Sequence, residues 1–207
     1  MKQYEIKAPS LWESGERKIL WVKEHMPLLR GLEEEMLATK LLTGLRVALS
    51  VHLEAKTAYL CRVLAAGGAE MYITGSNPLS TQDDVAAALA HEGFEVNAVH
   101  GIDMEGYEKH LEKTLSFRPH LIIDDGGDFI GLLHGKCRQY GDELIGGCEE
   151  TTTGIHRLKA REARGELDYT MINVNDADCK HLFDNRYGTG QSVWDGINRT
   201  TNLIVAG

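Results

Sequence analysis

The sequence predicts an α/β fold, an open and mainly parallel sheet with helices on both faces, as in Rossmann-like and flavodoxin-like three-layer domains. Three observations support this prediction. Short apolar segments rich in β-branched residues alternate with segments whose apolar residues recur at helical spacing. The strand-like segments contain continuous apolar runs, which are typical of strands buried on both faces of a parallel sheet. Polar residues follow several of these segments directly, where open parallel sheets bind ligands.

Five strands are expected, and the clearest is the apolar run 121–123. It leads directly into Asp124-Asp125-Gly126-Gly127. The two glycines allow the backbone to turn sharply or to approach a ligand closely. The alternative is an ordinary polar turn after a strand. The strands are expected over residues 45–51, 70–74, 94–99, 121–124 and 169–174.

Helices are expected between these strands. Residues 10–40 form two helices divided at Pro27, because proline is tolerated in a first helical turn but not in a helix interior. Ser80-Thr81-Gln82-Asp83 resembles a capping box that starts another helix, and Asp103 is expected to cap the next one. The remaining helices are expected soon after His52, from about 129 to 137, after residues 149–154, over 176–186 and over 191–206.

Composition narrows the class of protein. The chain has 207 residues, of which 43% are hydrophobic, which suits one domain with an ordinary core. Its formal net charge of −9 disfavours nonspecific binding to nucleic acid. No apolar run is long enough to span a bilayer, and no signal-peptide pattern opens the chain. A cytoplasmic protein without nucleic-acid or membrane partners is therefore expected.

Several common motifs are missing from the sequence. The four cysteines are far apart and form no C-x-x-C motif, so reduced thiols are expected and no metal site is predicted. There is no P-loop motif and no G-x-G-x-x-G after a strand. The nearest stretch, Gly188-Thr189-Gly190, carries little weight. Asn198-Arg199-Thr200 matches a glycosylation acceptor and is interpreted as chance, because no secretion signal is present.

Polar residues are expected to converge at one edge of the sheet. His52, residues 74–77, Asp124-Asp125 and residues 173–176 each follow a predicted strand. Residues 150–153 precede a helix, where free N–H groups favour an anionic or polar ligand. Such convergence is what a polar small-molecule site requires. These residues predict a ligand-binding domain and leave its chemistry open.

Five blocks of residues occur together in one order along the chain. They are Ser80-Thr81-Gln82-Asp83; Asp124-Asp125-Gly126-Gly127-Asp128; Glu149-Glu150-Thr151-Thr152-Thr153-Gly154; Asn173-Val174-Asn175-Asp176; and Lys180 with Phe183-Asp184-Asn185-Arg186-Tyr187-Gly188. Together they closely resemble the substrate-binding half of S-adenosylhomocysteine hydrolase. The resemblance runs from about Leu11 to Gly207. Each block is weak alone, but five in register are specific.

The resemblance implies a hydrolase of the methyl cycle in one-carbon metabolism. Enzymes of this family use a tightly held NAD to oxidise the ribose 3′-hydroxyl, eliminate homocysteine, add water and reduce the ketone again. By position, Asp125 and Glu150 match the carboxylates that bind substrate hydroxyls. Lys180 and Asp184 match the pair beside the 3′-hydroxyl, where a buried lysine can take the hydroxyl proton. His52 matches the histidine near the 5′ carbon and is a candidate for acid–base chemistry at the leaving sulfur.

Other matched positions concern the cofactor and the rest of the substrate. Asn175 matches a polar position of the pocket without an assigned role. The positions that match NAD-contacting residues are Thr151, Thr152, Thr153 and Asn185. The further substrate-binding candidates are Glu54, Lys56, Thr57 and Gln82.

Each candidate also has a purely structural alternative. Glu150 and the three threonines can simply cap a helix. Lys180 and Asp184 are spaced i, i+4 and can form a surface ion pair worth only a few tenths of a kcal/mol. A single histidine such as His52 at a strand end is more often structural than catalytic. The family resemblance favours a functional role for the acids and Lys180. For His52 it leaves a catalytic and a structural role equally supported.

The sequence also departs from the family pattern. Many members have threonine in place of Glu54 and glutamate in place of Lys56, and that glutamate accepts a hydrogen bond from the adenine amino group. A lysine can only donate, so it suits the 6-oxo group of hypoxanthine, and a preference for S-inosylhomocysteine is hypothesised. Thr189 replaces a cysteine of many members, which argues against essential thiol chemistry there.

The largest departure is at the end of the chain. Family members continue into a Rossmann domain with the glycine fingerprint, which holds most of the NAD site, and that domain is absent here. Residues 1–190 are therefore expected to form the substrate-binding domain, and residues 191–207 a hinge helix toward the missing domain. The chain alone is expected to be inactive, and the complete enzyme to be a homo-oligomer, usually a tetramer. The alternative is a non-catalytic nucleoside-binding or regulatory module derived from this family.

Overall fold

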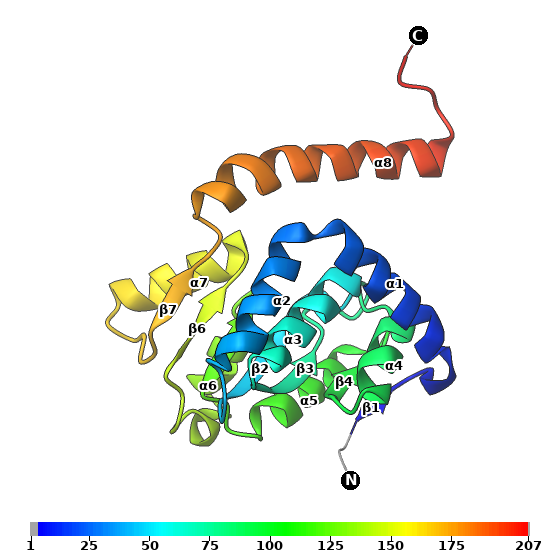
Figure 1. Cartoon of the computed structure of the whole chain (residues 1–207). Helices are drawn as coiled ribbons and strands as arrows, with labels where there is room; N and C mark the ends of the chain where they lie inside the picture. Colours follow the sequence, from blue (N-terminus) through cyan, green and yellow to red (C-terminus); the bar gives the residue numbers. More distant parts are fainter. Residues whose placement is uncertain (1–3, 207) are drawn as a thin grey trace.

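Seven parallel strands form one open sheet in residues 4–206, the part of the chain described by the computed structural model (Figure 1). The strands are β1 (Glu5–Ile6), β2 (Arg46–Ser50), β3 (Glu70–Thr74), β4 (Glu95–Ala98), β5 (Leu121–Asp124), β6 (Gly146–Glu149) and β7 (Met171–Asn173). Their order is β1-β4-β3-β2-β5-β6-β7, and every neighbouring pair is parallel. The predicted fold class is confirmed.

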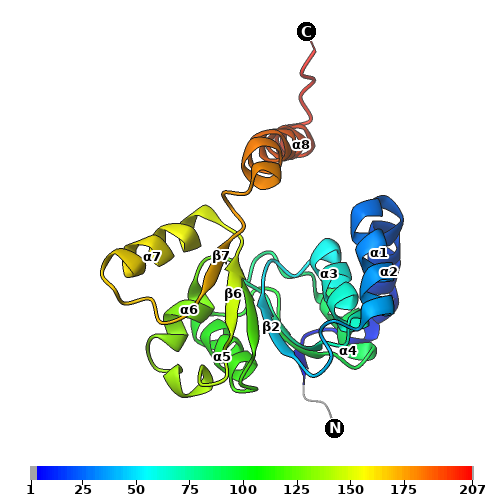
Figure 2. The same ribbon diagram turned by 60° about the vertical axis from the view of Figure 1, so that its left-hand side comes forward.

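Helices cover both faces of the sheet and give a three-layer domain (Figure 2). One face carries α1 (Trp12–His25), α2 (Pro27–Thr39), α3 (Ala55–Ala66) and α4 (Asp83–His91); the other carries α5 (Met104–Leu115), α6 (Asp128–Leu133) and α7 (Thr152–Ala163). Each face has its own hydrophobic core, one containing Ile19 and Tyr59 and the other containing Phe129 and Leu158. Within residues 4–206, no helix is long and apolar enough to cross a membrane.

Strands β1 and β6 were not predicted. β1 is only two residues long and pairs with β4 at the edge of the sheet. β6 begins with Gly146-Gly147, and glycine disfavours strands. Close packing explains both glycines: a Cβ at Gly147 would lie 2.3 Å from Ile122 Cγ1, and one at Gly146 would lie 2.6 Å from the Thr170 carbonyl oxygen. The two glycines therefore make β6 hard to predict from the sequence, and the same glycines leave the space in which β6 pairs with β5 and β7.

The two predicted helix caps have opposite outcomes. The capping box at residues 80–83 is wrong, because α4 begins at Asp83 and its N-cap residue, Gln82, makes no capping hydrogen bond with its side chain. The Ser80 hydroxyl donates instead to the Asn77 carbonyl, 3.0 Å away, within the preceding turn. The cap at Asp103 is confirmed, since its carboxylate accepts a first-turn backbone N–H of α5 at 2.8 Å.

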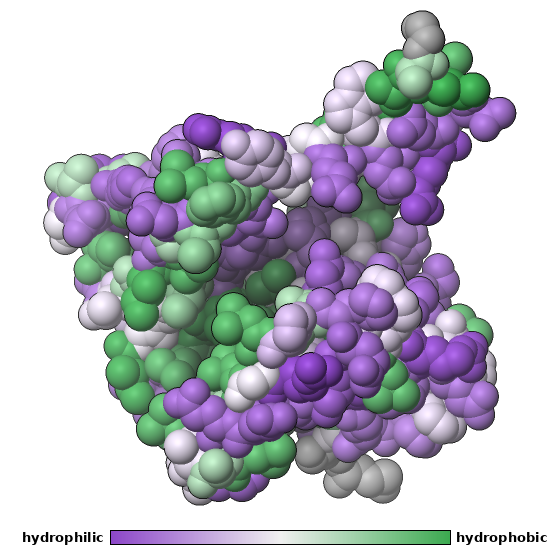
Figure 3. Space-filling view, turned by 45° about the horizontal axis from the view of Figure 1, so that its top comes forward, coloured by the Kyte–Doolittle hydropathy of each residue, from purple (hydrophilic) through white to green (hydrophobic). Residues whose placement is uncertain are grey.

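The last helices differ from the prediction in their bounds and in their type. A π-helix, η3 (Cys179–Gly188), continues without a break into α8 (Thr189–Thr201), where helices over 176–186 and 191–206 were expected. We call residues 179–201 the C-terminal arm. It projects from the sheet, and none of its residues is buried (Figure 1). Figure 3 shows the arm standing over a hollowed face, with apolar side chains beyond α8 at its tip. α6 is also shorter than expected and ends at Leu133.

Candidate active site

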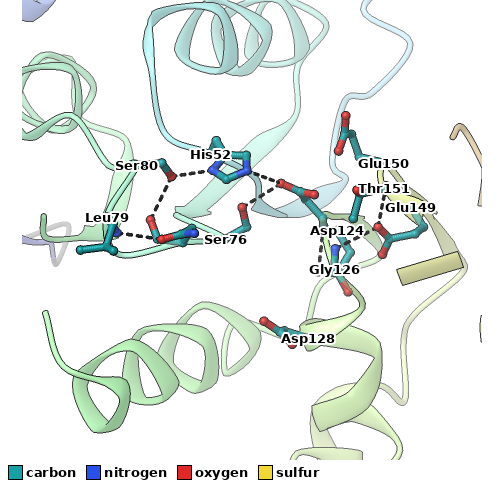
Figure 4. Close-up of polar contacts among 12 residues, drawn as sticks. His52, Ser76, Leu79, Ser80, Asp124, Gly126, Asp128, Glu149, Glu150 and Thr151 are labelled. Atoms are coloured by element: carbon teal, nitrogen blue, oxygen red, sulfur yellow. Dashed lines mark hydrogen bonds and ion pairs between the residues drawn. The ribbon is translucent and has the colours of Figure 1, made fainter. Parts of the chain in front are cut away.

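The direction of strand order reverses between β2 and β5, and polar side chains gather where these strands end. Open parallel sheets bind ligands at such a switch point, outside the carboxyl ends of the strands. His52 follows β2, Asp125 follows β5 and Glu150 follows β6. Three of the predicted site residues therefore lie along one edge of the sheet, where Figure 4 shows His52 and Glu150.

Asp125 is buried at this edge, with 8% of its surface exposed. The Ser76 hydroxyl, from the loop after β3, donates to its Oδ2 atom at 2.8 Å. His52 Nε2 lies 3.5 Å from the same oxygen. A buried carboxylate needs partners of this kind, and the loops after β2 and β3 supply them.

His52 lies between Ser80 and Asp125 and contacts each through one ring nitrogen. His52 Nδ1 lies 2.5 Å from Ser80 Oγ, and Nε2 lies 3.5 Å from Asp125 Oδ2. A hydroxyl can donate or accept, so Ser80 Oγ is a partner for either form of Nδ1, and it also lies 3.0 Å from the Asn77 carbonyl oxygen. An N–H group at Nε2 can donate to the Asp125 carboxylate.

Glu150 connects this edge of the sheet to the C-terminal arm. The Lys180 ammonium donates to the Glu150 carbonyl oxygen at 2.8 Å and also to Glu150 Oε1. Burial raises the pKa of Glu150, the hydrogen bond from Lys180 opposes this rise, and the neighbouring Asp125 adds to it. The structural alternative in which Glu150 caps α7 is wrong, because its carboxylate pairs with Lys180.

Asp184 lies on the same π-helix as Lys180 but is placed differently. Its side chain is exposed, and within residues 4–206 it forms no ion pair with Lys180. A π-helix bonds i to i+5, so the i, i+4 alignment of an α-helix is lost. The alternative of an i, i+4 surface pair is therefore also wrong. The Asp184 carboxylate lies beside Gly188, where an added Cβ would be 3.2 Å from Asp184 Oδ1.

The residues that match NAD contacts form a polar group around Asn175. Asn175 is buried, and its Oδ1 accepts from Thr152 Oγ1 and from Asn185 Nδ2, each at 3.2 Å. Thr151 occupies the N-cap position of α7 without a capping hydrogen bond from its side chain, and Thr153 is exposed. These hydroxyls and amides can donate and accept hydrogen bonds, so they fit the hydroxyl and carboxamide groups of a nicotinamide nucleotide.

Three of the four further substrate-binding candidates line an open pocket of about 800 Å³ between α1 and α3; they are Glu54, Lys56 and Gln82. Glu54 is the N-cap of α3, and its Oε1 accepts the backbone N–H groups of Lys56 and Thr57. Lys18 on α1 donates to Gln82 Oε1 at 2.9 Å. Because a lysine can only donate, the Gln82 amide oxygen faces Lys18 and its NH₂ group is left for other partners. Thr57 itself is buried.

A second pocket of about 690 Å³ lies on the other face of the sheet, between α5, α6 and α7. Its lining includes Tyr107, Asp128 and Arg157 but none of the predicted site residues. Among residues 4–206 no cluster of three or more His, Cys, Asp or Glu side chains is arranged to hold a metal ion.

Two fully buried acids lie directly beneath the site. Asp124 and Glu149 are register partners on β5 and β6, and neither is exposed. Burial raises the pKa of both carboxyls, and the charge of Glu149 further raises the pKa of Asp124. Two acids this close in a dry environment resist carrying two charges together.

Sequence reasoning missed several residues that shape this site. Ser76 is among the residues expected at this edge, because it follows a strand, but its contact with Asp125 was not predicted. Ser80 was predicted in a capping box and a family block, and its contact with His52 was not predicted. Glu149 was predicted as part of a motif without a role of its own. Lys18 lies far from Gln82 in sequence, so no local signal identifies it.

The fold and the site together define an α/β domain with a polar small-molecule site at the carboxyl ends of its parallel strands. The chain belongs to the S-adenosyl-L-homocysteine hydrolase family, which it matches over residues 3–141 and 133–201. The expected family is thereby confirmed.

Individual relatives carry two different names. The chain is 54% identical over 204 residues to the S-inosyl-L-homocysteine hydrolase of Methanocaldococcus jannaschii, covering 99% of this chain and 49% of that protein. It is 54% identical over 194 residues to the adenosylhomocysteinase of Thermotoga maritima, covering 94% and 48%. It is 50% identical over 204 residues to the adenosylhomocysteinase of Pyrococcus abyssi, covering 99% and 48%. The chain spans about half the length of these curated relatives.

Proposed function

We propose that this chain is the substrate-binding half of an NAD-dependent hydrolase that reversibly cleaves S-adenosyl- or S-inosyl-L-homocysteine to the nucleoside and L-homocysteine. The observation that carries the proposal is the connected series His52, Asp125, Glu150 and Lys180 at one sheet edge. Family membership supports the reaction class. The acids suit ribose hydroxyls, which donate hydrogen bonds to carboxylates.

Each residue of this series has a distinct proposed role. Asp125 and Glu150 accept hydrogen bonds from the ribose hydroxyls. Lys180 has three N–H groups and gives two of its hydrogen bonds to Glu150, so one remains for the substrate 3′-oxygen. Asp184, one turn along η3, is proposed to complete this part of the site. His52, whose imidazole nitrogens can accept or donate a proton, moves a proton at the leaving sulfur.

NAD is proposed as the cofactor, with most of its site outside this chain. When bound, it supplies reversible oxidation at the ribose 3′ carbon. Thr152 and Asn185 would contact it from this side, held in place by Asn175, and Thr151 and Thr153 would contribute their hydroxyls. The chain alone is proposed to be inactive and the complete enzyme to be a homo-oligomer. An assay of the isolated chain with NAD and S-adenosylhomocysteine should show no turnover, and substantial turnover would contradict this.

The purine base is proposed to bind beside Lys56 and Gln82. Lys56 can only donate, and Gln82 presents its NH₂ group because Lys18 holds the amide oxygen. Two donors suit the 6-oxo group of hypoxanthine and not the 6-amino group of adenine. This favours S-inosyl-L-homocysteine as the substrate, in keeping with relatives that carry that name.

A non-catalytic nucleoside-binding module is the second candidate function. The two candidates share the ligand and differ in whether a separate NAD domain restores turnover. Mixing the chain with such a domain from a relative and assaying hydrolysis would separate them.

Calorimetric titration of the 207-residue chain with nucleosides tests the shared part of the proposal. Inosine is expected to bind, adenosine to bind more weakly, and 2′,3′-dideoxyinosine to lose most of the affinity because it lacks the hydroxyls that the two acids bind. Equal affinity for inosine and its dideoxy analogue would contradict the proposed roles of Asp125 and Glu150.

A further inference from the structure

One buried side chain joins the two loops that carry the proposed hydroxyl-binding acids. Glu149 Oε1 accepts the backbone N–H of Gly126, in the loop after β5, at 2.9 Å. The same oxygen accepts the backbone N–H of Thr151, in the loop after β6, also at 2.9 Å. These bonds flank the acids directly, since Gly126 follows Asp125 and Thr151 follows Glu150 (Figure 4).

The surroundings of Glu149 are shaped to hold its carboxyl in this position. A Cβ at Gly154, in the first turn of α7, would lie 2.1 Å from Glu149 Cδ. Only glycine therefore leaves room for the carboxyl at that point of the helix. Gly126 has φ of +116°, a conformation that residues with side chains rarely adopt. Gly154 is therefore explained by the Glu149 carboxyl, and Gly126 by its own backbone conformation.

Asp124 provides the comparison within the same structure. It is equally buried and is the register partner of Glu149, but its oxygens accept N–H groups of Asp125 and Ile130, both on its own side of the sheet edge. Glu149 instead reaches across from β6 to the loop after β5. Among residues 4–206, its second oxygen, Oε2, has no hydrogen-bond partner. One oxygen atom of Glu149 thus accepts an N–H group from each loop, beside the main-chain bond from Glu150 N–H to the Asp124 carbonyl oxygen at 3.0 Å.

We propose that Glu149 is a positioning residue that fixes the separation of Asp125 and Glu150 through its two backbone hydrogen bonds. The inference rests on the proposed function, because those two acids are proposed to bind adjacent ribose hydroxyls. Adjacent hydroxyls set a fixed spacing, and a site that must match it gains from loops held in one arrangement. Without the Glu149 oxygen, the N–H groups of Gly126 and Thr151 lose their shared acceptor. The two strand ends then stay joined by the Glu150 N–H bond to the Asp124 carbonyl oxygen, at 3.0 Å.

Three variants of the 207-residue chain test the role. Glu149→Ala removes the oxygen. Gly154→Ala keeps Glu149 but displaces its carboxyl, and Gly131→Ala on α6 is the matched control because an added Cβ there meets nothing within 4 Å. Glu149→Gln keeps an acceptor at the Oε1 position and should rescue the connection. Amide hydrogen exchange at Gly126 and Thr151, and inosine affinity, are the two measurements.

Glu149→Ala and Gly154→Ala should both speed amide hydrogen exchange at Gly126 and Thr151. The Ile130 amide, which donates to Asp124, should stay protected. Both variants should also weaken inosine binding by about 10- to 100-fold, as loss of supporting hydrogen bonds commonly does. Glu149→Gln and Gly131→Ala should stay within about threefold of the parent chain, an effect too small to indicate a lost hydrogen bond.

Two results would overturn the inference. Unchanged exchange at Gly126 and Thr151 in Glu149→Ala would show that the connection is not needed. Faster exchange with unchanged inosine affinity would show that it does not position the acids. If the parent chain binds no nucleoside, the proposed function fails separately, and exchange alone decides whether Glu149 holds the loops. Uniformly faster exchange, Ile130 included, would indicate general unfolding and would also count against a positioning role.

Discussion

The two halves of the proposed site are built in different ways. His52, Asp125 and Glu150 lie on short loops after parallel strands, above two hydrophobic cores. Lys180 and Asp184 lie on the C-terminal arm, where no side chain is buried. The first half is held by the sheet. The second half is tied to it by side-chain hydrogen bonds from Lys180 to Glu150 and from Asn185 to Asn175.

This difference teaches which part of the site is preorganised. Strand ends in a packed sheet have little freedom, so the acids keep their geometry without a ligand. An arm with an exposed apolar face has more freedom, because few buried contacts hold it. Ligand binding should therefore order the arm far more than the strand ends. The effects of substitutions in the two halves should therefore differ in size and in kind.

The largest effect is expected from Asp125→Ala. Removing a buried carboxylate that holds Ser76 and His52 should weaken inosine binding by about 3 kcal/mol, or roughly 100-fold. Calorimetry measures the change. Asp142→Ala, at a side chain that is 67% exposed, is the matched control and should leave affinity unchanged. Similar losses of inosine affinity in Asp125→Ala and Asp142→Ala would contradict a special role of the strand ends in binding.

A smaller loss of inosine affinity is expected from Lys180→Ala, because this variant removes only the hydrogen bonds that join the C-terminal arm to Glu150. Inosine affinity should fall by about tenfold, the cost of one or two charged hydrogen bonds. Limited proteolysis should cut the arm faster in the variant, and the strand-end loops should be unaffected. Lys159→Ala, whose exposed side chain pairs with Asp176, is the control. Unchanged proteolysis of the arm would show that Lys180 does not fasten it.

A change in preference rather than in overall affinity is expected from Lys56→Glu. Glutamate accepts where lysine donates, so the ratio of inosine to adenosine affinity should fall by roughly tenfold, about the value of one base-edge hydrogen bond. Binding of each nucleoside is measured in the same buffer. Lys40→Glu, remote from the site, is the control. A ratio that does not move would place the 6-position of the base away from Lys56.

The smallest effect is expected on the free energy of unfolding, when a buried acid beneath the strand ends is replaced by its amide. A carboxyl whose pKa is raised by folding contributes stability below its unfolded pKa, and that contribution is lost as pH rises through the folded pKa. Burial raises the pKa of Glu149 in this way. Glu149→Gln cannot ionise, so its free energy of unfolding relative to the parent chain should improve as pH rises from about 4 upward.

Urea unfolding at several pH values measures this difference. The charged groups around Glu149 are common to both proteins, so their titration largely cancels; they are Asp124, Asp125, Asp128, Glu150, Lys180 and Arg157. Glu143→Gln is a control of opposite sign, because hydrogen bonds from Arg46 and His120 lower the pKa of that exposed acid. A constant difference across pH for Glu149→Gln would contradict the raised pKa.

Much of the fold was predictable because its elements have strong local signals. The apolar run before Asp124 and the Asp103 cap both predicted the correct structure. β6 was missed because its two glycines are explained only by contacts with Ile122 and Thr170, which lie elsewhere in the sequence.

The site was predictable in its residues more than in its connections. Positions after predicted strands identified His52 and Asp125, and the position before a predicted helix identified Glu150, as members of one polar edge. The Lys180–Glu150 contact joins residues 30 positions apart, and the turn at Ser80 serves His52 instead of a helix cap. Such contacts depend on how loops from different strands meet, which no local pattern contains.

The location of inosine in a crystal of the 207-residue chain tests the central claim most directly. The account predicts that the ribose lies over the carboxyl ends of β5 and β6, with its hydroxyls within hydrogen-bond distance of the Asp125 and Glu150 carboxylates. Inosine bound instead in the pocket between α5, α6 and α7, away from both acids, would contradict it.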